Sequence, residues 1–332
     1  MTAGRRIGPE TVGAYLDCLD RADQATAIRL ATELLDAGCS VADVLVDLVA
    51  VAQREIGRRW LTGTWSVAQE HAATHVSELV VNAVAARHSG PADRGHVVMA
   101  CVEGEWHALA ARIVAEVVRA AGWRVTFLGA SVPGRHLVSY LHQTGPEAVL
   151  LSCVQPNRLV RAARMIEACR SSGVPVVAGG PGFGPDGRWA AAVGAAAWGA
   201  TARDAVRLLD RQLFTAAHTG PPAAPPDDEY VALLRRRREI VQLAVRAVEP
   251  PDEAADDVAT AVAHLVDAMA AAIRVGDPQL LLDFVGWQDE VFAARGGRRL
   301  VDAVLASCEA ALAEHPRACH HLRLARSVAG PA

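Results

Sequence analysis

The hydrophobic period of the chain changes at Ser89-Gly90-Pro91, and this change constrains the fold more than any other feature. Residues 8–90 carry apolar side chains at three-to-four spacing, which predicts a four-helix bundle. Short apolar runs then alternate with longer amphipathic segments, the rhythm of a doubly wound parallel sheet. We therefore expect a Rossmann-like, flavodoxin-like domain over residues 94–215. Its expected strands are His96–Val102, Arg124–Leu128, Ala148–Val154, Pro175–Ala178 and a short fifth strand at Ala195–Gly199.

A proline-rich segment at residues 216–228 is typical of a stiff connector and separates a third part of the chain. Residues 229–314 again carry helical periodicity, broken at Pro250-Pro251, Gly276-Asp277-Pro278 and Gly296-Gly297, so we expect an all-α domain over residues 229–328. The predicted fold class is therefore α/β plus all-α, with the bundle first, the parallel-sheet domain second and an all-α domain last.

The composition excludes several kinds of chemistry. All 33 basic residues are arginine, which excludes a Schiff-base lysine and a Walker-type phosphate site. The net charge of −4 argues against a broad nucleic-acid surface. The longest apolar run, Ala190–Ala200, is shorter than the roughly 20 residues that span a bilayer, so we expect no membrane helix. The scattered cysteines and the polar Met1–Glu10 predict a reduced, cytoplasmic protein.

The first expected strand runs into Glu103-Gly104-Glu105-Trp106-His107. The carboxyl ends of strands in an open parallel sheet form the ligand crevice, so this loop lies where a cofactor would bind. Glu105 precedes His107 by two residues. Its carboxylate can therefore accept a hydrogen bond from one ring nitrogen and raise the basicity of the other. A Glu-x-His pattern alone is more typical of an ordinary surface loop.

A second set of residues lies in the bundle. Trp60 ends one helix, and the capping box Ser66-Val67-Ala68-Gln69 opens the next. Glu70 and His71 therefore lie in the first turns of that helix, across the hairpin from the tryptophan. Such a group could close over a ligand held on the sheet. The alternative is a core tryptophan with a solvated Glu-His pair.

The order and spacing of Trp60, Glu70-His71 and Glu105-Trp106-His107 resemble the cobalamin-binding light sensors of the CarH type. Two later elements agree with this resemblance, which covers about residues 8–215. Ser152-Cys153-Val154 resembles the family's Ser-x-Leu element, and Gly179-Gly180 resembles its paired glycines.

The resemblance implies that His107 binds cobalt from below and displaces the cofactor's own base, while the cofactor tail runs past Ser152, Val154 and Gly179-Gly180. It also implies that Trp60, Glu70 and His71 enclose the upper adenosyl group. Leu61 stands where the best-known members carry a histidine that captures cobalt after illumination. A different residue, or none, has that role here.

A cobalamin domain followed by an all-α domain resembles the photocobilins, whose second domain binds a bilin such as biliverdin in a globin-like fold. The resemblance implies that His264, Asp283 and Trp287 contact the bilin, although helical domains also carry such residues for packing alone. Cys308 or Cys319 could form a thioether to it, with a buried inert cysteine as the alternative. We interpret Arg235–Arg238 as a solvated helix face and Cys319-His320-His321 as a frayed terminus.

These observations predict a sensor, not an enzyme, in which light breaks the cobalt–carbon bond of adenosylcobalamin and the bundle changes position. The alternatives are a corrinoid carrier for methyl transfer and a non-photochemical cobalamin sensor. We expect a homo-oligomer that acts on an unknown downstream signalling protein. The family's helix-turn-helix domain precedes the bundle and this chain begins at the bundle, so we expect no direct contact with nucleic acid. We expect no contact with a membrane, because no apolar run is long enough to span one.

Overall fold

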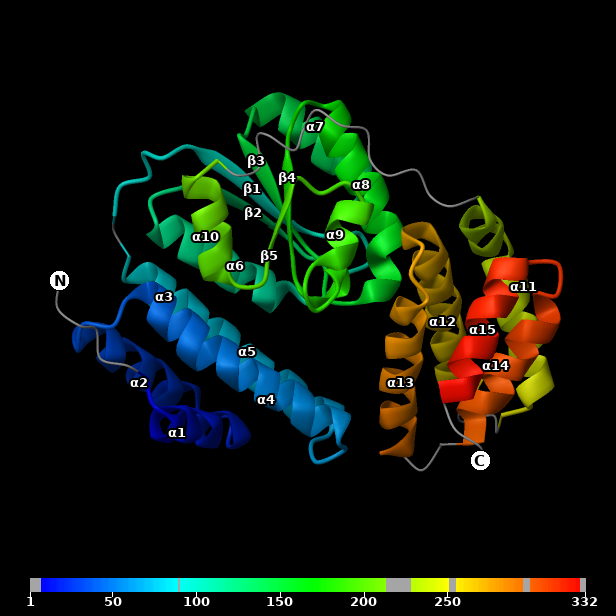
Figure 1. Cartoon of the computed structure of the whole chain (residues 1–332). Helices are drawn as coiled ribbons and strands as arrows, with labels where there is room; N and C mark the ends of the chain where they lie inside the picture. Colours follow the sequence, from blue (N-terminus) through cyan, green and yellow to red (C-terminus); the bar gives the residue numbers. More distant parts are fainter. Residues whose placement is uncertain (1–6, 89, 213–227, 251–254, 295–298, 329–332) are drawn as a thin grey trace. The chain divides into compact units, whose positions relative to one another are not determined.

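The computed structural model describes residues 7–88, 90–212, 228–250, 255–294 and 299–328, which form two compact units (Figure 1). The first unit contains the N-terminal helices and the sheet. The second unit contains the C-terminal helices together with residues 153–167 and 181–194. The predicted connector, apart from Asp228, lies outside the described residues.

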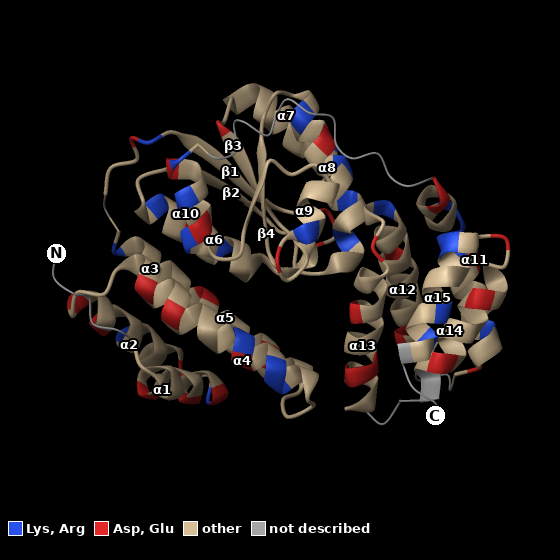
Figure 2. Cartoon of the chain, viewed as in Figure 1, with Lys and Arg blue, Asp and Glu red and all other residues tan. Residues whose placement is uncertain are grey.

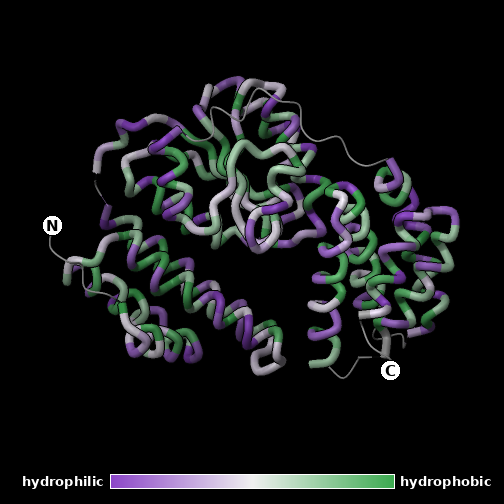
Figure 3. Tube along the Cα trace, in the orientation of Figure 1, coloured by the Kyte–Doolittle hydropathy of each residue, from purple (hydrophilic) through white to green (hydrophobic). Residues whose placement is uncertain are grey.

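The N-terminal region is helical, as predicted. A serine or aspartate caps three of its helix starts: Asp23 accepts from the Thr26 amide, and Ser40 and Ser66 each form a capping box. Hydrophilic and hydrophobic residues alternate along these helices, which places one face of each in a shared core (Figure 3). The elements are α1 (Pro9–Asp20), α2 (Gln24–Asp36), the continuous run α3 (Val41–Asp43), η1 (Val44–Val49) and α4 (Ala50–Leu61), and α5 (Val67–Ala86).

The predicted parallel sheet is confirmed, with five strands in the order β2-β1-β3-β4-β5. This order is that of a flavodoxin-like doubly wound fold. The strands are β1 (His96–Cys101), β2 (Arg124–Gly129), β3 (Ala148–Ser152), β4 (Val176–Gly179) and β5 (Ala197–Gly199). The connecting helices are α6 (Ala108–Ala120), α7 (Gly134–Thr144), α8 (Leu159–Ser171), α9 (Arg188–Ala192) and α10 (Ala202–Asp210), with short 3-10 turns η2 (Pro156–Arg158) and η3 (Pro181–Phe183).

Helix α6 joins the bundle to the sheet because it is apolar on two sides. Leu109, Ile113 and Val117 are buried in the core of the bundle. The small residues Ala111 and Ala115 are buried in the core of the sheet, next to strand residues such as Val97 and Met99. The helix that begins directly after His107 is therefore held by both cores.

A second connection between bundle and sheet is ionic. The Arg203 guanidinium of α10 lies 2.9 Å from Asp43 and 2.7 Å from Asp47 of the bundle. Figure 2 shows the acidic residues of α3 and the basic residues of α10. Asp47 lies in the π-helical segment η1, and π-helical turns often occur at functional positions.

The C-terminal part is helical, as predicted, and its globin-like arrangement stays a prediction. Its elements are α11 (Glu229–Val248), α12 (Ala255–Val275), α13 (Gln279–Ala293), α14 (Arg299–Ala311) and α15 (Pro316–Val328). Contrary to the expectation from apolar runs, α12 is long and apolar enough to cross a membrane, with a mean hydropathy of 1.5 in its most apolar window. That window is 67% buried inside the structure, which is typical of a core helix.

Two interpretations of this part need correction. Cys319-His320-His321 is not a frayed terminus but part of α15, where Cys319 and His321 are each only 6% exposed. The backbone amides of Arg317 and Ala318 at the start of α15 donate to Glu229 of α11, so a distant carboxylate caps this helix. The run Arg235–Arg238 is only partly a solvated face, because Arg237 pairs with the buried Asp267.

Candidate functional site

The Glu105–His107 contact predicted from the spacing is present in the structure. Oε1 of Glu105 lies 2.5 Å from Nδ1 of His107 and accepts a hydrogen bond from the His107 backbone amide at 3.1 Å. The Glu105 side chain is 1% exposed, whereas the His107 ring is 55% exposed. The carboxylate therefore orients the ring from the protein side, with Nε2 outside this contact. Trp106, between them, is 73% exposed.

The loop that carries this pair is held by backbone bonds that the sequence did not suggest. The Glu105 amide donates to the Val102 carbonyl at 2.8 Å, and the Ser131 amide donates to the Glu105 carbonyl at 2.9 Å. The Ser131 hydroxyl accepts from the Gly104 amide. Ser131 has a φ of +47°, a left-handed conformation that non-glycine residues rarely adopt. A serine after β2 is a weak signal, so sequence reasoning missed this support.

The predicted residues after β3 and β4 lie on neighbouring strands. Ser152 is in register with Cys101 of β1 on one side and with Gly179 of β4 on the other. Ser152 is buried and Val154, two residues later, is half-buried. Gly180 has a φ of +100°, which favours glycine at the point where the chain leaves the sheet. These residues and the loop of His107 thus follow the carboxyl ends of three adjacent strands.

In the bundle, Trp60 lies half-buried in the last turn of α4, and Glu70 lies in the first turn of α5. Oε2 of Glu70 is 2.5 Å from Nδ1 of His71, whose side chain is 74% exposed. The Thr74 hydroxyl donates to Oε1 of Glu70 at 2.9 Å. The carboxylate is therefore fixed at both oxygens.

Sequence reasoning missed the polar chain behind Glu70. The Thr74 hydroxyl is also 3.3 Å from the Gln53 amide oxygen, and the Gln53 amide nitrogen donates to Ser77 at 2.7 Å. The Tyr15 hydroxyl reaches the same Ser77 hydroxyl at 3.2 Å. Tyr15 and Ser77 are fully buried, and burial raises the pKa of Tyr15. A row of hydrogen bonds thus runs from the bundle core to Glu70.

Two family models match this part of the chain. Both describe a B12 binding domain, one over residues 13–84 and the other over residues 95–207. The chain is a cobalamin-binding protein. The two matches correspond to the bundle and to the sheet domain, and the loop of His107, the ends of β3 and β4 and the hairpin after Trp60 all lie within the matched residues.

Relatives of this part of the chain fall into two groups. Trimethylamine corrinoid protein 1 of Methanosarcina mazei is 25% identical over 205 residues, which cover 59% of this chain and 94% of that protein. The HTH-type transcriptional repressor CarH of Myxococcus xanthus is 34% identical over 131 residues, which cover 38% of this chain and 43% of that protein. The structure of the monomethylamine corrinoid protein of Methanosarcina barkeri matches with a TM-score of 0.54 at 18% identity, over 61% of this chain and 98% of that one. That likeness concerns the fold alone.

The residues present fit a corrinoid. Imidazole is a suitable ligand for cobalt, and a carboxylate on its second nitrogen fixes the tautomer and strengthens the ligand. The His107 ring is exposed on one side and held by a buried acid on the other. The exposed indole of Trp106 adds apolar surface for a large flat cofactor. His107 would hold the cobalt of the bound cofactor.

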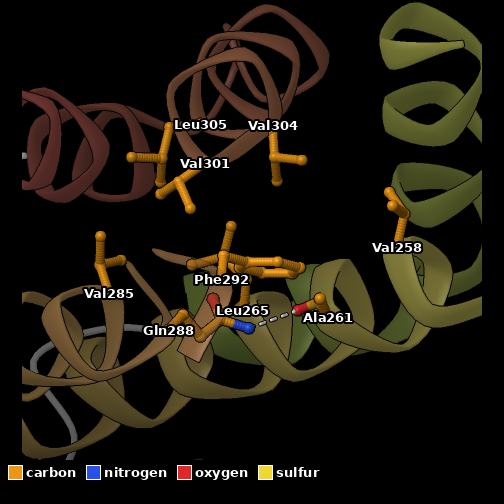
Figure 4. A pocket seen from close by; sticks show the side chains of 9 residues that line it. All are labelled: Val258, Ala261, Leu265, Val285, Gln288, Phe292, Val301, Val304 and Leu305. Atoms are coloured by element: carbon orange, nitrogen blue, oxygen red, sulfur yellow. Dashed lines mark hydrogen bonds between the residues drawn. The ribbon is translucent and has the colours of Figure 1, made fainter. Parts of the chain in front are cut away.

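The C-terminal helices enclose an apolar cavity, and the residues predicted to bind a bilin do not line it. Nine residues line that cavity, among them Leu265, Phe292 and Gln288, whose amide donates to the Ala261 carbonyl (Figure 4). His264, Asp283 and Trp287 are not among them. Asp283 is exposed and accepts a hydrogen bond from Gln279, and Trp287 packs against Phe284 with ring centroids 5.8 Å apart and ring planes tilted by 41°.

The cysteines of this region are buried, as the alternative interpretation predicted. Burial raises the pKa of Cys308 to about 12, which keeps its thiol protonated and weakly nucleophilic. All seven cysteines lie within the described residues and are buried.

Proposed function

We propose that this protein is a light sensor that binds adenosylcobalamin, with His107 as the lower ligand of cobalt and with Trp60, Glu70 and His71 against the upper group. The observation that carries the proposal is the fixed Glu70 carboxylate, held by Thr74 and His71 beside the Trp60 hairpin. An indole and an oriented carboxylate suit an upper group that has both a flat base and ribose hydroxyls.

Each residue then has a defined task. His107 would hold the metal through Nε2, while Glu105 holds Nδ1. Glu70 accepts hydrogen bonds from hydroxyl groups, and Trp60 packs on the base and excludes water. When bound, adenosylcobalamin supplies a cobalt–carbon bond that visible light breaks. The contacts of Trp60 and Glu70 with the upper group stabilise one position of the bundle. When that group leaves, this stabilisation is lost and the other position becomes more populated. A ligand can shift such an equilibrium only if it contacts the two states differently.

The test uses the full chain in the dark with adenosylcobalamin. We expect an absorption spectrum in which histidine replaces the cofactor's own base, and a change of both spectrum and assembly state after green light. His107→Ala should lose the histidine-ligated spectrum. His142→Ala, which removes an exposed histidine of α7, is the matched control. A spectrum that stays constant under illumination would reject photosensing.

A second candidate is a corrinoid carrier for methyl transfer. Its support is that the relative named a trimethylamine corrinoid protein is covered over 94% of its length. A carrier must open its upper face to a partner enzyme, so Trp60 would then leave that face accessible. Preference for methylcobalamin over adenosylcobalamin, with an unchanged assembly state in light, would favour the carrier.

We also retain a bilin in the C-terminal helices as part of this proposal, bound near His264, Asp283 and Trp287. Purification in the presence of biliverdin should then add red absorbance to the protein. The variant Trp287→Ala should reduce it, whereas a colourless protein would reject the second chromophore.

A further inference from the structure

Two segments next to the predicted cobalamin residues, each a loop followed by helical residues, belong by their packing to the C-terminal unit. Residues 153–167 follow Ser152 directly, and residues 181–194 follow Gly179-Gly180 directly. Both segments form one compact unit with the C-terminal helices. The same loops are thus continuous at one end with residues predicted to contact the cofactor and packed at the other against helices of the C-terminal domain.

The first connection is a buried ionic cluster. Arg158 of η2 has a side chain that is 12% exposed, and its Nη1 lies 3.9 Å from Oδ2 of Asp267 on α12. Asp267 is 7% exposed and also accepts two hydrogen bonds from Arg237, at 2.7 and 3.0 Å. One buried carboxylate therefore balances two guanidinium groups, one from the loop after β3 and one from α11.

The second connection is a buried hydrogen bond to the other loop. Nε1 of Trp189 on α9 donates to Oδ2 of Asp277 at 2.8 Å, and Trp189 is 4% exposed. Asp277 lies in the turn between α12 and α13. Arg274, at the end of α12, reaches the Ala192 carbonyl at 3.4 Å. The turn after α12 thus holds the loop after β4.

The two loops also contact each other directly through their backbones. The Gly182 amide donates to the Cys153 carbonyl at 3.0 Å, and a Cβ on Gly182 would lie 2.8 Å from that oxygen. In the first of the two loops, Asn157 of η2 is 4% exposed, and neither of its side-chain amide atoms has a hydrogen-bond partner among the described residues. A buried amide without partners raises the free energy of the present loop arrangement.

We infer that Asp267 and Asp277 are positioning residues for the cobalamin site. Through Arg158 and Trp189 they set the positions of the loops after β3 and β4, so the C-terminal helices control cobalamin affinity. Because coupling between two sites is reciprocal, a bound cofactor tail in turn stabilises α12. The inference rests on cobalamin binding and requires no photochemistry.

The experiment uses the full chain and hydroxocobalamin in the dark, so a failure of light sensing leaves its result unaffected. In the parental protein, cobalamin should slow amide hydrogen exchange in the loop after β1 and also in α12. Asp267→Asn should keep the histidine-ligated spectrum but raise the dissociation constant about fivefold or more, the lower end of typical coupling. In that variant, cobalamin should no longer protect α12.

Asp302→Asn is the matched control, since it removes an exposed ion pair with Arg326 in the same helical domain. This variant should bind hydroxocobalamin with parental affinity, and the bound cofactor should slow hydrogen exchange in α12 as it does in the parental chain. Asp277→Asn weakens the hydrogen bond that Trp189 donates and should raise the dissociation constant as Asp267→Asn does. This second variant keeps the test decisive if Asp267→Asn does not fold. Unchanged exchange in α12 on cobalamin binding, or parental affinity in both variants, would overturn the inference.

Discussion

The carboxylate of Glu105 holds His107 at two points, the ring nitrogen Nδ1 and the backbone amide. The first contact fixes which nitrogen faces outward, and the second fixes the backbone from which the ring projects. Since Glu105 is almost fully buried, this orientation precedes any ligand.

Replacing Glu105 by glutamine removes the charge that strengthens the imidazole. We expect cobalamin affinity to fall by about 10- to 100-fold, the usual effect of such supporting groups. Titration followed by absorbance measures it. Glu103→Gln changes an exposed acid of the same loop and should bind normally. Equal affinities in the two variants would contradict the role of Glu105.

Thr74→Val removes the hydroxyl that holds the Glu70 carboxylate. If Glu70 recognises the upper group, adenosylcobalamin should bind about three- to tenfold more weakly, the worth of one hydrogen bond. Hydroxocobalamin, which lacks that group, should bind as before. Thr144→Val, on α7, is the control. A loss of the same size for both cobalamins would show that Thr74 has only a structural role.

Arg203→Ala removes the ionic connection between α10 and the bundle. The three side chains are 36–45% exposed, so we expect a loss of unfolding free energy of about 1 kcal/mol or less. Urea denaturation of both proteins at low and high salt measures this loss. Salt screens exposed charges, so the difference in unfolding free energy between the parental protein and Arg203→Ala should be smaller at high salt. Arg207→Ala removes an ion pair with Asp204 inside α10, so it is the control for losing an exposed arginine that does not connect α10 to the bundle.

Two glycine substitutions should have opposite effects. Gly182→Ala places a methyl group 2.8 Å from the Cys153 carbonyl oxygen and should cost about 1–3 kcal/mol of stability. Gly57→Ala, inside α4, meets nothing within 4 Å and should stabilise the protein by up to about 1 kcal/mol. The denaturation midpoints of the two variants, compared with that of the parental protein, measure these changes in stability. A Gly182→Ala protein more stable than the parental one would contradict this, because it would mean that the loops after β3 and β4 move apart to accommodate the methyl group at little cost in free energy.

Stability should fall as the pH drops below about 6.5. Burial lowers the pKa of His264, and Arg158, Arg237 and Arg161 act in the same direction while Asp267 opposes them. The unfolded chain therefore takes up a proton at a pH where the folded chain does not, which favours unfolding. Melting temperatures between pH 7.5 and 5.5 should decline less steeply for His264→Gln. Parallel curves for the two proteins would exclude this contribution.

Much of the fold follows from local pattern. The strands could be predicted because β-branched and apolar runs bounded by glycine and proline have a period that helices do not share. The Glu105–His107 contact could be predicted too, because two residues in one tight loop meet whatever the rest of the chain does. Shorter signals were weaker: the polar segment of α15 carries too little apolar periodicity to identify it as a helix.

The amino-acid sequence by itself determined the order of bundle, parallel sheet and C-terminal helices, and the short-range groups at His107 and Glu70. Only the tertiary structure decided which residues stand behind them. Tyr15, Gln53 and Ser77 meet because separate helices pack together, and Asp267 reaches Arg158 from a helix that lies about a hundred residues further along the chain. Such contacts depend on how whole elements pack, and neither propensity nor spacing encodes that packing locally.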